Sequence, residues 1–453
     1  MLKGLYKSRW FPLVPQALVL AFFGYLVFNG LGVSTDDPDF AKILRNTNLS
    51  NLIVWSYWFP LIVLSAVLLG RHWCTICPIE LVTSLAGRIG LRRKPGRFLK
   101  SGWAITAFYS VILVLGVQTF AIHRIPQRMA VYMLILLGVA VLSGLVWEKR
   151  SFCTHICPVG HLLGLYSLLS SAEWRVRKPQ TCSECRTKDC VAKDSLYRLT
   201  ARSCTSDLYP AKIMDNRRCI LCSQCLSSCP YDNPGLRLRK PLKDLFSDLR
   251  LSSAETAFII LVSGFVVYEV LSEWGTTKAM LMTLPDAISS SWGITGVWTG
   301  TVKAVVLFMV FPILFFAVFA GIRRLVGDRS IRRSFESISL GLLPIMGGMH
   351  VLKAILKMTS RIPYWPQALA DRGGIQTAQA LASGSAQLNK AILETADPYI
   401  MGLGVALPAV GFGLSAWVVS RRAGDSRSEK TITLMAALIY AAVFEASIIG
   451  WRL

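Results

Sequence analysis

The chain has 453 residues, of which 53% are hydrophobic and only 17% are charged, and its net charge at pH 7 is +23. This composition is more apolar and less charged than that of an ordinary soluble domain, which argues for a membrane protein. We attribute the positive charge mostly to membrane topology and to contact with anionic lipids, and because no nucleic-acid recognition fold is visible we expect no nucleic-acid partner.

Apolar stretches near 20 residues long recur along the whole chain, and a helix of that length crosses a hydrocarbon core of about 30 Å. They cover residues 11–33, 52–70, 102–122, 129–147, 254–271, 301–322, 337–356, 399–420 and 431–450. The first stretch shows no small-residue cleavage site, so we expect it to be retained as a helix. The pattern predicts an all-α polytopic membrane protein with about nine transmembrane helices.

The distribution of Lys and Arg predicts the orientation, because cytoplasmic loops are enriched in both residues. With the N-terminus inside, the cytoplasmic segments hold 37 of the 49 Lys and Arg residues. We therefore expect a multi-pass protein of the bacterial inner membrane with its C-terminus outside. All twelve cysteines lie between Cys74 and Cys229, on the predicted cytoplasmic side, where reducing conditions favour metal ligation over disulfides.

A repeat follows the second and fourth predicted spans. Its first copy is Cys74-Thr-Ile-Cys77-Pro78, and its second is Cys153-Thr-His-Ile-Cys157-Pro158. Three interpretations remain open for the four thiols: a shared third cluster or other metal, a redox-active or partner-docking thiol pair, and buried structural thiols. An arginine three residues before each copy would help the thiols to ionise, which does not decide between the three.

The most specific motif is Cys219-x2-Cys222-x2-Cys225-x3-Cys229-Pro230, which has the spacing of the bacterial ferredoxin run. In that run the first three cysteines bind one 4Fe-4S cluster, while the fourth, redirected by the proline, binds the other cluster of a two-cluster domain. The further cysteines that such a domain needs are present upstream, at Cys182, Cys185, Cys190 and Cys204.

The crossed arrangement divides these eight cysteines into two groups of four. One predicted cluster is bound by Cys182, Cys185, Cys190 and Cys229, and the other by Cys204, Cys219, Cys222 and Cys225. Two zinc sites with four thiolates each are the alternative, because Cys-x2-Cys is also a zinc spacing. Zinc does not require the full ferredoxin order, so we predict two 4Fe-4S clusters.

With its twin Cys-Pro motifs at helix ends and the two four-cysteine sets that follow, the chain resembles the membrane-bound polyferredoxins of the NapH/NosR type. The resemblance covers roughly residues 50–235 and leaves out the chain from Ala254 onward, including the four C-terminal spans. It implies electron transfer with other redox subunits and with quinone, and it leaves open whether the chain itself is the quinol-oxidising subunit. The first motif departs from the more frequent Cys-x3-Cys-Pro by one residue.

The expected organisation is an N-terminal membrane domain over 1–177, an inserted small α+β ferredoxin-like domain over 178–240, and a C-terminal membrane domain over 241–453. We expect electron transfer between the quinone pool and a redox partner through 4Fe-4S clusters. The alternatives are a redox-sensing or metalloenzyme-maturation protein and a subunit of an ion-translocating redox complex.

Ionisable residues within the C-terminal spans are costly in a membrane and often mark a pathway. Glu269, His350 and Glu445 fall in the outer halves of three spans and are candidates for a quinone or proton site. The alternative is that these residues form ion pairs that hold the helices together. We expect no haem, because a b-type haem in a membrane usually takes two histidines from facing helices, and only His350 lies well inside a span, with His123 at the outer end of the third span as its one possible partner.

Overall fold

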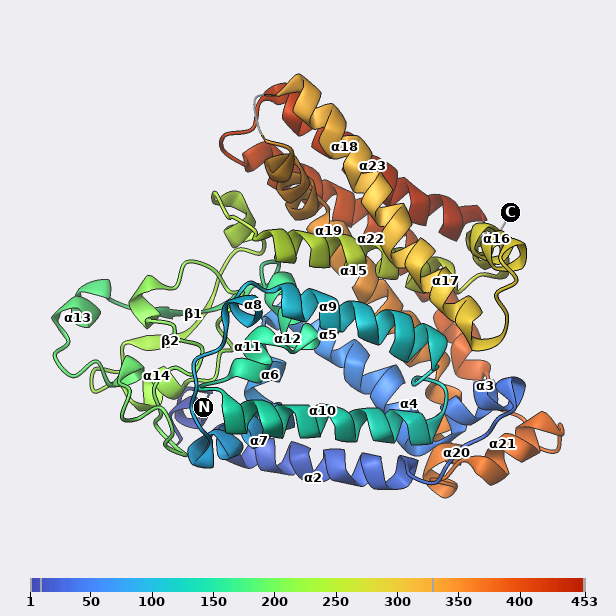
Figure 1. Ribbon diagram of the computed structural model, residues 1–453, viewed down its shortest axis with the longest axis horizontal. Helices are drawn as coiled ribbons and strands as arrows, with labels where there is room; N and C mark the ends of the chain where they lie inside the picture. The colour runs from blue at the N-terminus through green and yellow to red at the C-terminus, as the bar shows by residue number, and fades with distance from the viewer. Residues whose placement is uncertain (1, 9, 328–329, 451–453) are drawn as a thin grey trace. The chain divides into compact units, whose positions relative to one another are not determined.

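The computed structural model describes residues 2–8, 10–327 and 330–450 of the chain. Within these residues helices dominate, and the only two strands, β1 (Ala172–Val176) and β2 (Pro234–Leu238), pair antiparallel with Trp174 opposite Leu236 (Figure 1). The predicted fold class, an all-α polytopic membrane protein with a small α+β insertion, is confirmed.

Eight helical segments of the described chain are long and apolar enough to cross a membrane. They are Leu13–Gly30, Leu49–Leu69, Pro126–Val146, Ser253–Leu271, Gly296–Val326, Ile331–Ala370, Ala391–Arg421 and Arg427–Gly450. Each overlaps one of the predicted spans. The remaining predicted span, 102–122, corresponds to the shorter apolar helix Trp103–Thr119. Its length is at the lower limit for crossing a hydrocarbon core, which accounts for the difference between nine and eight.

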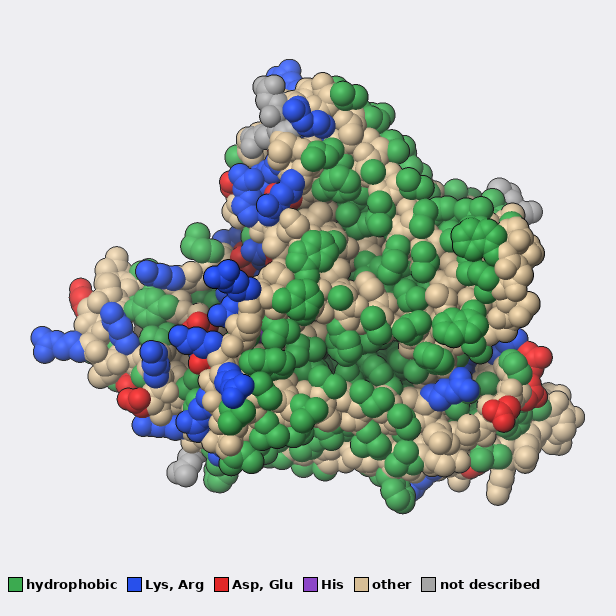
Figure 2. Space-filling view, in the orientation of Figure 1, with side chains coloured by type: hydrophobic (Ala, Val, Ile, Leu, Met, Phe, Trp, Pro, Cys, Tyr) green, Lys and Arg blue, Asp and Glu red, His purple; other side chains and the backbone are tan. Residues whose placement is uncertain are grey.

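Large apolar side chains are exposed along these helices. Leu18 and Phe28, for example, are 67% and 77% exposed, and Figure 2 shows hydrophobic side chains over most of the helical surface on the face drawn. Contact with water at so many apolar positions would be unfavourable, whereas contact with lipid tails is not. The surface therefore suits a multi-pass membrane protein.

The chain divides into two compact units. Unit 1 comprises residues 1–31, 62–105 and 130–244, and unit 2 comprises 32–61, 106–129 and 245–453. All twelve cysteines lie in unit 1. Unit 1 combines N-terminal membrane helices with the cysteine-rich segment. The expected division into three domains stays a prediction.

Unit 1 contains helices, short turns of helix and the two strands. Its helices are α1 (Leu2–Lys7), α2 (Leu13–Gly30), α6 (His72–Ile76), α7 (Pro78–Ile89), α8 (Arg97–Lys100), α11 (Ser151–His155), α12 (Pro158–Tyr166), α13 (Pro179–Glu184) and α14 (Gln224–Ser227), with 3-10 turns η3 (Asp189–Val191) and η4 (Pro210–Lys212). Helices α5 (Phe59–Leu69), α9 (Trp103–Val111) and α10 (Pro126–Val146), and the 3-10 turn η5 (Lys243–Phe246), have residues in both units.

Unit 2 is built from long helices with π-helical and 3-10 turns. Its elements are α3 (Pro38–Thr47), α4 (Leu49–Ile53), η1 (Val54–Trp58), η2 (Ile112–Thr119), α15 (Ser253–Leu271), α16 (Gly275–Ser291), η6 (Gly296–Trp298), α17 (Thr299–Val305), η7 (Val306–Val310), α18 (Phe311–Val326), α19 (Ile331–Ser360), η8 (Ile362–Tyr364), α20 (Trp365–Ala370), α21 (Ile375–Ala382), α22 (Ala391–Arg421) and α23 (Arg427–Gly450).

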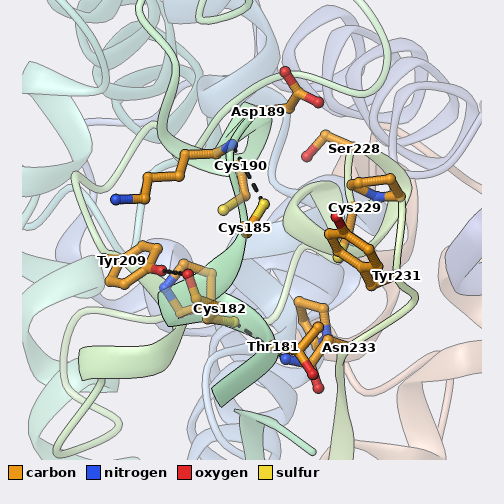
Figure 3. A pocket seen from close by; sticks show the side chains of 14 residues that line it. Thr181, Cys182, Cys185, Asp189, Cys190, Tyr209, Ser228, Cys229, Tyr231 and Asn233 are labelled. Carbon is orange, nitrogen blue, oxygen red and sulfur yellow. Dashed lines mark hydrogen bonds between the residues drawn. The ribbon is translucent and has the colours of Figure 1, made fainter. Parts of the chain in front are cut away.

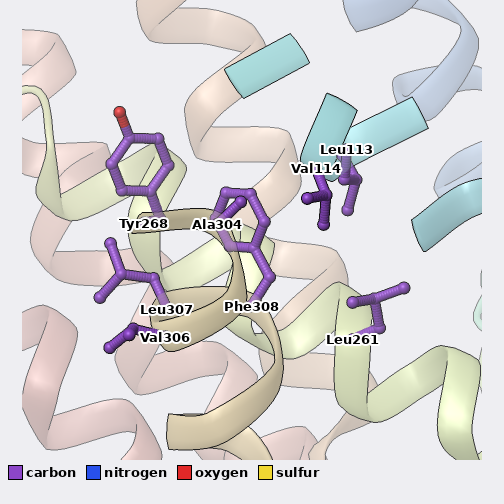
Figure 4. Packing of buried hydrophobic residues seen from close by; sticks show 8 residues of the cluster. All are labelled: Leu113, Val114, Leu261, Tyr268, Ala304, Val306, Leu307 and Phe308. Atoms are coloured by element: carbon purple, nitrogen blue, oxygen red, sulfur yellow. The ribbon is translucent and has the colours of Figure 1, made fainter. Parts of the chain in front are cut away.

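Buried hydrophobic side chains join η2, α15, α17 and η7 within unit 2 (Figure 4). Phe308 and Ala304 are fully buried there, and Leu261 of α15 and Leu113 of η2 belong to the same cluster. Helix α15 begins with a capping box, in which the Ser252 side chain and the carboxylate at the third helical residue satisfy each other's backbone N–H groups.

Candidate metal centre

Four cysteines of the predicted ferredoxin module line one pocket in unit 1 (Figure 3). We call them the first ferredoxin set: Cys182, Cys185, Cys190 and Cys229. The Asn233 side-chain amide donates to the Cys182 sulfur at 3.1 Å, and the backbone N–H of Lys188 donates to the Cys185 sulfur at 3.4 Å. Lys188 adopts a left-handed conformation with φ of 48°, which belongs to the turn that aims its N–H at the sulfur.

The sulfurs of this set interact electrostatically with one another. Burial, and then the neighbouring thiolates of Cys229, Cys182 and Cys185, raise the pKa of Cys190 to about 12. The pKa of Cys185 is lowered instead, chiefly because the N–H of Lys188 stabilises its thiolate. Concentrated thiolate charge of this kind is relieved when a cation or an iron–sulfur core binds among the sulfurs.

A second pocket in unit 1 is lined by the other four cysteines of the module. We call them the second ferredoxin set: Cys204, Cys219, Cys222 and Cys225. Leu221 and Ser223 have φ values of 60° and 59°, and these left-handed turns let backbone N–H groups face the sulfurs of Cys219 and Cys222. The buried Trp174 of β1 donates its indole N–H to the Cys225 sulfur at 3.0 Å.

The four cysteines of the repeat also come together in unit 1. We call them the Cys-Pro set: Cys74, Cys77, Cys153 and Cys157. Cys77 and Cys157 are extended residues directly before Pro78 and Pro158, and each occupies the N-cap position of the helix that follows. Burial, followed by the charges of the other three thiolates, raises the pKa of Cys77 well above its ordinary value.

The donor chemistry of these sets fits an iron–sulfur cluster. Each set offers four thiols, and among the described residues that line the two ferredoxin pockets none is histidine. In the part of the chain that the structure describes, no three His, Cys, Asp or Glu side chains are placed to hold a single metal ion. Zinc draws four thiolates to about 4 Å from one another, whereas a cubane binds one thiolate at each of four separate irons.

Among the three candidate quinone or proton residues, the structure brings Glu269 and His350 together in unit 2. Phe265, one turn before Glu269 on α15, packs on the His350 ring of α19 with 6.0 Å between ring centroids. The Glu269 carboxylate lies 3.3 Å from the Lys353 ammonium, one turn after His350. Glu445 lies on α23 and accepts a hydrogen bond from the backbone of Ala409 on α22.

The Glu269 carboxylate also interacts electrostatically with His123, the other histidine considered for haem. The His123 ring packs edge-on against Trp55 with 6.1 Å between ring centroids, and its carbonyl accepts from Asn51 at 3.1 Å. These contacts belong to unit 2 and give the ring a packing partner. The expectation that this pair does not bind haem stays a prediction.

Several residues at these sites are missed by the sequence reasoning. Trp174 and Asn233 each donate to a cysteine sulfur that is 51 residues away in the chain. Glu80 lies buried beside the Cys-Pro set and pairs with arginines 70 and 122 residues further along. No spacing pattern marks these residues, and the only local signal is the charge of Glu80 two residues after the proline of a Cys-Pro motif.

Comparison with known proteins bears on the same residues. A family model described as a 4Fe-4S binding domain matches residues 51–97 and 129–179, which contain both Cys-Pro motifs and end before Cys182. The resemblance to membrane-bound polyferredoxins is confirmed. The matched residues therefore resemble a 4Fe-4S binding domain, and the long apolar helices suit a multi-pass membrane protein.

Two curated proteins are similar to parts of this chain. Protein NirI of Paracoccus denitrificans is 25% identical over 195 residues, which cover 37% of this chain and 27% of that protein. The putative electron transport protein YccM of Escherichia coli is 28% identical over 207 residues, which cover 40% of this chain and 54% of that protein. The chain thus spans about a quarter and about half of the lengths of these relatives. No solved structure matches the chain.

Proposed function

We propose that this chain passes electrons between the quinone pool and a redox protein partner through three 4Fe-4S clusters, one in each cysteine set. The observation that carries the proposal is the grouping of twelve cysteines, scattered over 156 residues of sequence, into three groups of four within one compact unit. A bound cluster supplies a one-electron carrier at each set.

The ligand assignment follows the three groups. The first and second ferredoxin sets have the membership that the crossed arrangement predicts. For the Cys-Pro set, a third cluster is favoured over structural thiols because the four sulfurs repel one another and because the matched 4Fe-4S family model covers this set. The Cys-x2-Cys-x2-Cys-x3-Cys-Pro order of the ferredoxin run supports clusters over zinc, because zinc does not require that order.

The contacts of unit 1 put the second ferredoxin set between the other two. Pro210 lines both ferredoxin pockets, and the backbone N–H of Cys204 donates to the carbonyl of Cys190 at 2.9 Å. On the other side, the Thr75 hydroxyl, between two Cys-Pro cysteines, donates to the carbonyl of Ile220, between two cysteines of the second set. The proposed order of electron carriers is therefore the Cys-Pro set, the second ferredoxin set and the first ferredoxin set.

The surface of the first ferredoxin set is where a protein partner exchanges electrons. All of its cysteines are partly exposed, and Tyr231 at the pocket edge is 56% exposed. Lys and Arg side chains gather over the region of α13, β1 and β2 on the face drawn in Figure 2. We place this surface in the cytoplasm, in keeping with the 37 Lys and Arg residues of the segments on that side.

Quinone exchange is the part of the proposal that rests on unit 2. Glu269 and His350 offer a carboxylate and an imidazole in one place, which are the groups that a quinone needs for hydrogen bonding and proton transfer. The Lys353 ion pair supports the competing structural role of Glu269. Glu445 belongs to a separate contact and provides a matched comparison.

Iron and acid-labile sulfide analysis of the anaerobically purified full chain, with EPR of the reduced protein, tests the cluster assignment. We expect about twelve iron atoms per chain, because each cubane holds four. About eight would remove the cluster of the Cys-Pro set, and stoichiometric zinc in place of iron would overturn the whole proposal.

The quinone part is tested by reducing the clusters with a water-soluble quinol in proteoliposomes. We expect His350→Ala and Glu269→Gln to slow cluster reduction at least tenfold, and Glu445→Gln to slow it much less. Equal rates in the wild type and in His350→Ala would place the quinone elsewhere.

A further inference from the structure

The two repeats share a buried arginine beside the Cys-Pro set. Arg71 precedes Cys74 by three residues, and Arg150 precedes Cys153 by the same interval. Their exposed fractions are only 7% and 4%. Burying a guanidinium group is unfavourable unless negative charge or several acceptors surround it, so two arginines buried at equivalent positions indicate an anionic neighbour.

Arg71 contacts Cys74 of the first repeat and interacts electrostatically with Cys157 of the second. One terminal nitrogen of its guanidinium lies 3.6 Å from the Cys74 sulfur, and the other donates to the carbonyl of Arg217. A Cβ at Gly160 would lie 3.3 Å from the Arg71 guanidinium and 3.6 Å from the Cys157 sulfur. Glycine at this position therefore leaves room for Arg71 beside the cysteine of the second repeat.

Arg150 lies between the Cys-Pro set and the second ferredoxin set. Its guanidinium forms a hydrogen bond with Cys153, and its electrostatic interactions reach Cys74 of the first repeat. It also interacts with Cys222 of the second ferredoxin set, and it donates at 3.3 Å to Ser206, two residues after Cys204. A single positive charge is thereby shared between two groups of four thiolates.

The repeats differ at the second residue after the motif, where Glu80 in the first corresponds to Gly160 in the second. The Glu80 carboxylate is 3.4 Å from Arg150 and 2.8 Å from Arg202, and it accepts from the Gln16 amide at 2.6 Å. Three guanidinium groups and one carboxylate leave this buried network with two positive charges. Four thiolates around an oxidised cubane core carry two negative charges, and one-electron reduction adds a third.

We infer that Arg71 and Arg150 set the reduction potential of the cluster in the Cys-Pro set, and that Glu80 opposes them. This inference rests on the proposed cluster at that set. The network balances the charge of the oxidised form and stabilises the reduced form, because each buried cation lowers the free energy of the added electron. Since Arg150 also faces Cys222, it raises the potential of the second ferredoxin set as well, by a smaller amount.

The test is an EPR-monitored redox titration of the purified full chain in three variants. Arg150→Gln removes the shared charge, Glu80→Gln removes the opposing charge with little change of shape, and Arg150→Lys keeps the charge. Arg198→Gln, which changes an exposed arginine of unit 1, is the matched control. The signal of the Cys-Pro set is identified by its loss in a Cys77→Ser/Cys157→Ser variant.

We expect Arg150→Gln to lower the potential of that signal, Glu80→Gln to raise it, and Arg150→Lys and Arg198→Gln to leave it close to the wild type. Electrostatic tuning predicts shifts of opposite sign for Arg150→Gln and Glu80→Gln. A packing role would make these two neutral variants shift the potential in the same direction. If Arg150→Gln loses iron, the other two variants test the inference. Electrostatic tuning predicts a higher reduction potential for Glu80→Gln and an unchanged potential for Arg150→Lys.

Shifts of the same sign in both neutral variants, or no shift with about twelve iron atoms retained, would overturn the inference and leave the proposed clusters intact. A wild-type iron content of about eight would instead overturn the cluster at the Cys-Pro set, and the inference with it.

Discussion

The Cys-Pro set and the first ferredoxin set both gather four thiols, but they offset thiolate charge in different ways. Around the first ferredoxin set, neutral N–H groups of Asn233 and Lys188 point at the sulfurs. Around the Cys-Pro set, the guanidinium groups of Arg71 and Arg150 are buried against the sulfurs. A full charge stabilises an added electron more than an N–H dipole does, so the two sets differ in electrostatic design.

Sequence spacing explains this difference. In the ferredoxin run only two or three residues separate successive cysteines, so that left-handed turns can aim successive backbone N–H groups at the sulfurs. The Cys-Pro set instead combines two pairs of cysteines, and 76 positions separate Cys77 of the first pair from Cys153 of the second. In each pair, a helix begins directly after the second cysteine. Backbone N–H groups of Gly160 and Ile79 still reach Cys157 and Cys77 there, and the two buried guanidinium groups add full positive charges.

The largest expected effect comes from removing thiols of one set at a time. We expect Cys77→Ser/Cys157→Ser and Cys182→Ser/Cys229→Ser each to lose about four of twelve iron atoms, because each pair belongs to one proposed cubane. Iron analysis and EPR of the reduced variants measure the loss. A full iron content in the first variant would show that the Cys-Pro thiols are not ligands.

A smaller loss is expected from Gly164→Ala, which perturbs the support of Arg71. A Cβ at Gly164 on α12 would lie 2.7 Å from the Arg217 carbonyl, the acceptor of the Arg71 guanidinium, so the backbone beside Cys219 must move. Overpacking of this kind costs about 1–3 kcal/mol. We expect a lower Tm and partial loss of iron.

Gly138→Ala is the matched control for that variant, because it also changes a helical glycine and has open space around its Cβ position. A Tm for Gly164→Ala equal to that of Gly138→Ala would show that the contact with Arg217 adapts without cost.

Much of this molecule is predicted by its sequence. The apolar stretches locate the long helices, and the Cys-Pro-terminated ferredoxin run separates eight cysteines into the same two groups that line the two pockets. Both predictions rest on local rules: a membrane fixes the length of a helix, and a proline fixes the direction of the chain after Cys229.

The rest depends on contacts between distant segments, which no local pattern encodes. The pairing of Glu80 with Arg150 and the bond from Trp174 to Cys225 join residues 70 and 51 positions apart. The location of Glu445 also depends on which side of α23 it occupies. Hydropathy locates a transmembrane helix but does not determine its rotation about its own axis. The sequence therefore groups Glu445 with Glu269 only because both lie at a similar depth in the predicted membrane.

Trp174→Phe tests how much one neutral donor contributes to the second ferredoxin set. The variant removes the N–H that donates to the Cys225 sulfur at 3.0 Å, and hydrogen bonds to cluster sulfurs raise the reduction potential. We expect a lower potential for this set alone, smaller than the shift from Arg150→Gln, in an EPR-monitored titration. Trp292→Phe, at a side chain 76% exposed in unit 2, is the control.

A shift in Trp174→Phe as large as that in Arg150→Gln would contradict the ranking of full charges above N–H dipoles. An unchanged potential would show that the indole N–H contributes only to packing against the set.

The smallest effect concerns the iron-free chain at alkaline pH. Burial and the neighbouring thiolates raise the pKa of Cys190 from 9.0 to about 12, so the folded chain keeps a proton that the unfolded chain releases. The stability from this proton is complete below about pH 9 and is lost as the pH rises toward 12. We expect Cys190→Ser to weaken the fall of Tm above pH 9.

Cys185 has the opposite sign within the same set, and this makes it the control. Its pKa is lowered, so its thiolate adds stability above the unfolded-state pKa and loses it as the pH falls. Cys185→Ser therefore leaves the fall of Tm above pH 9 unchanged, because the stability from this thiolate is already complete there, whereas Cys190→Ser makes that fall shallower. Equal slopes in the two variants would mean that the sulfurs of the iron-free set do not repel one another, and that the N–H of Lys188 does not favour one thiolate over another.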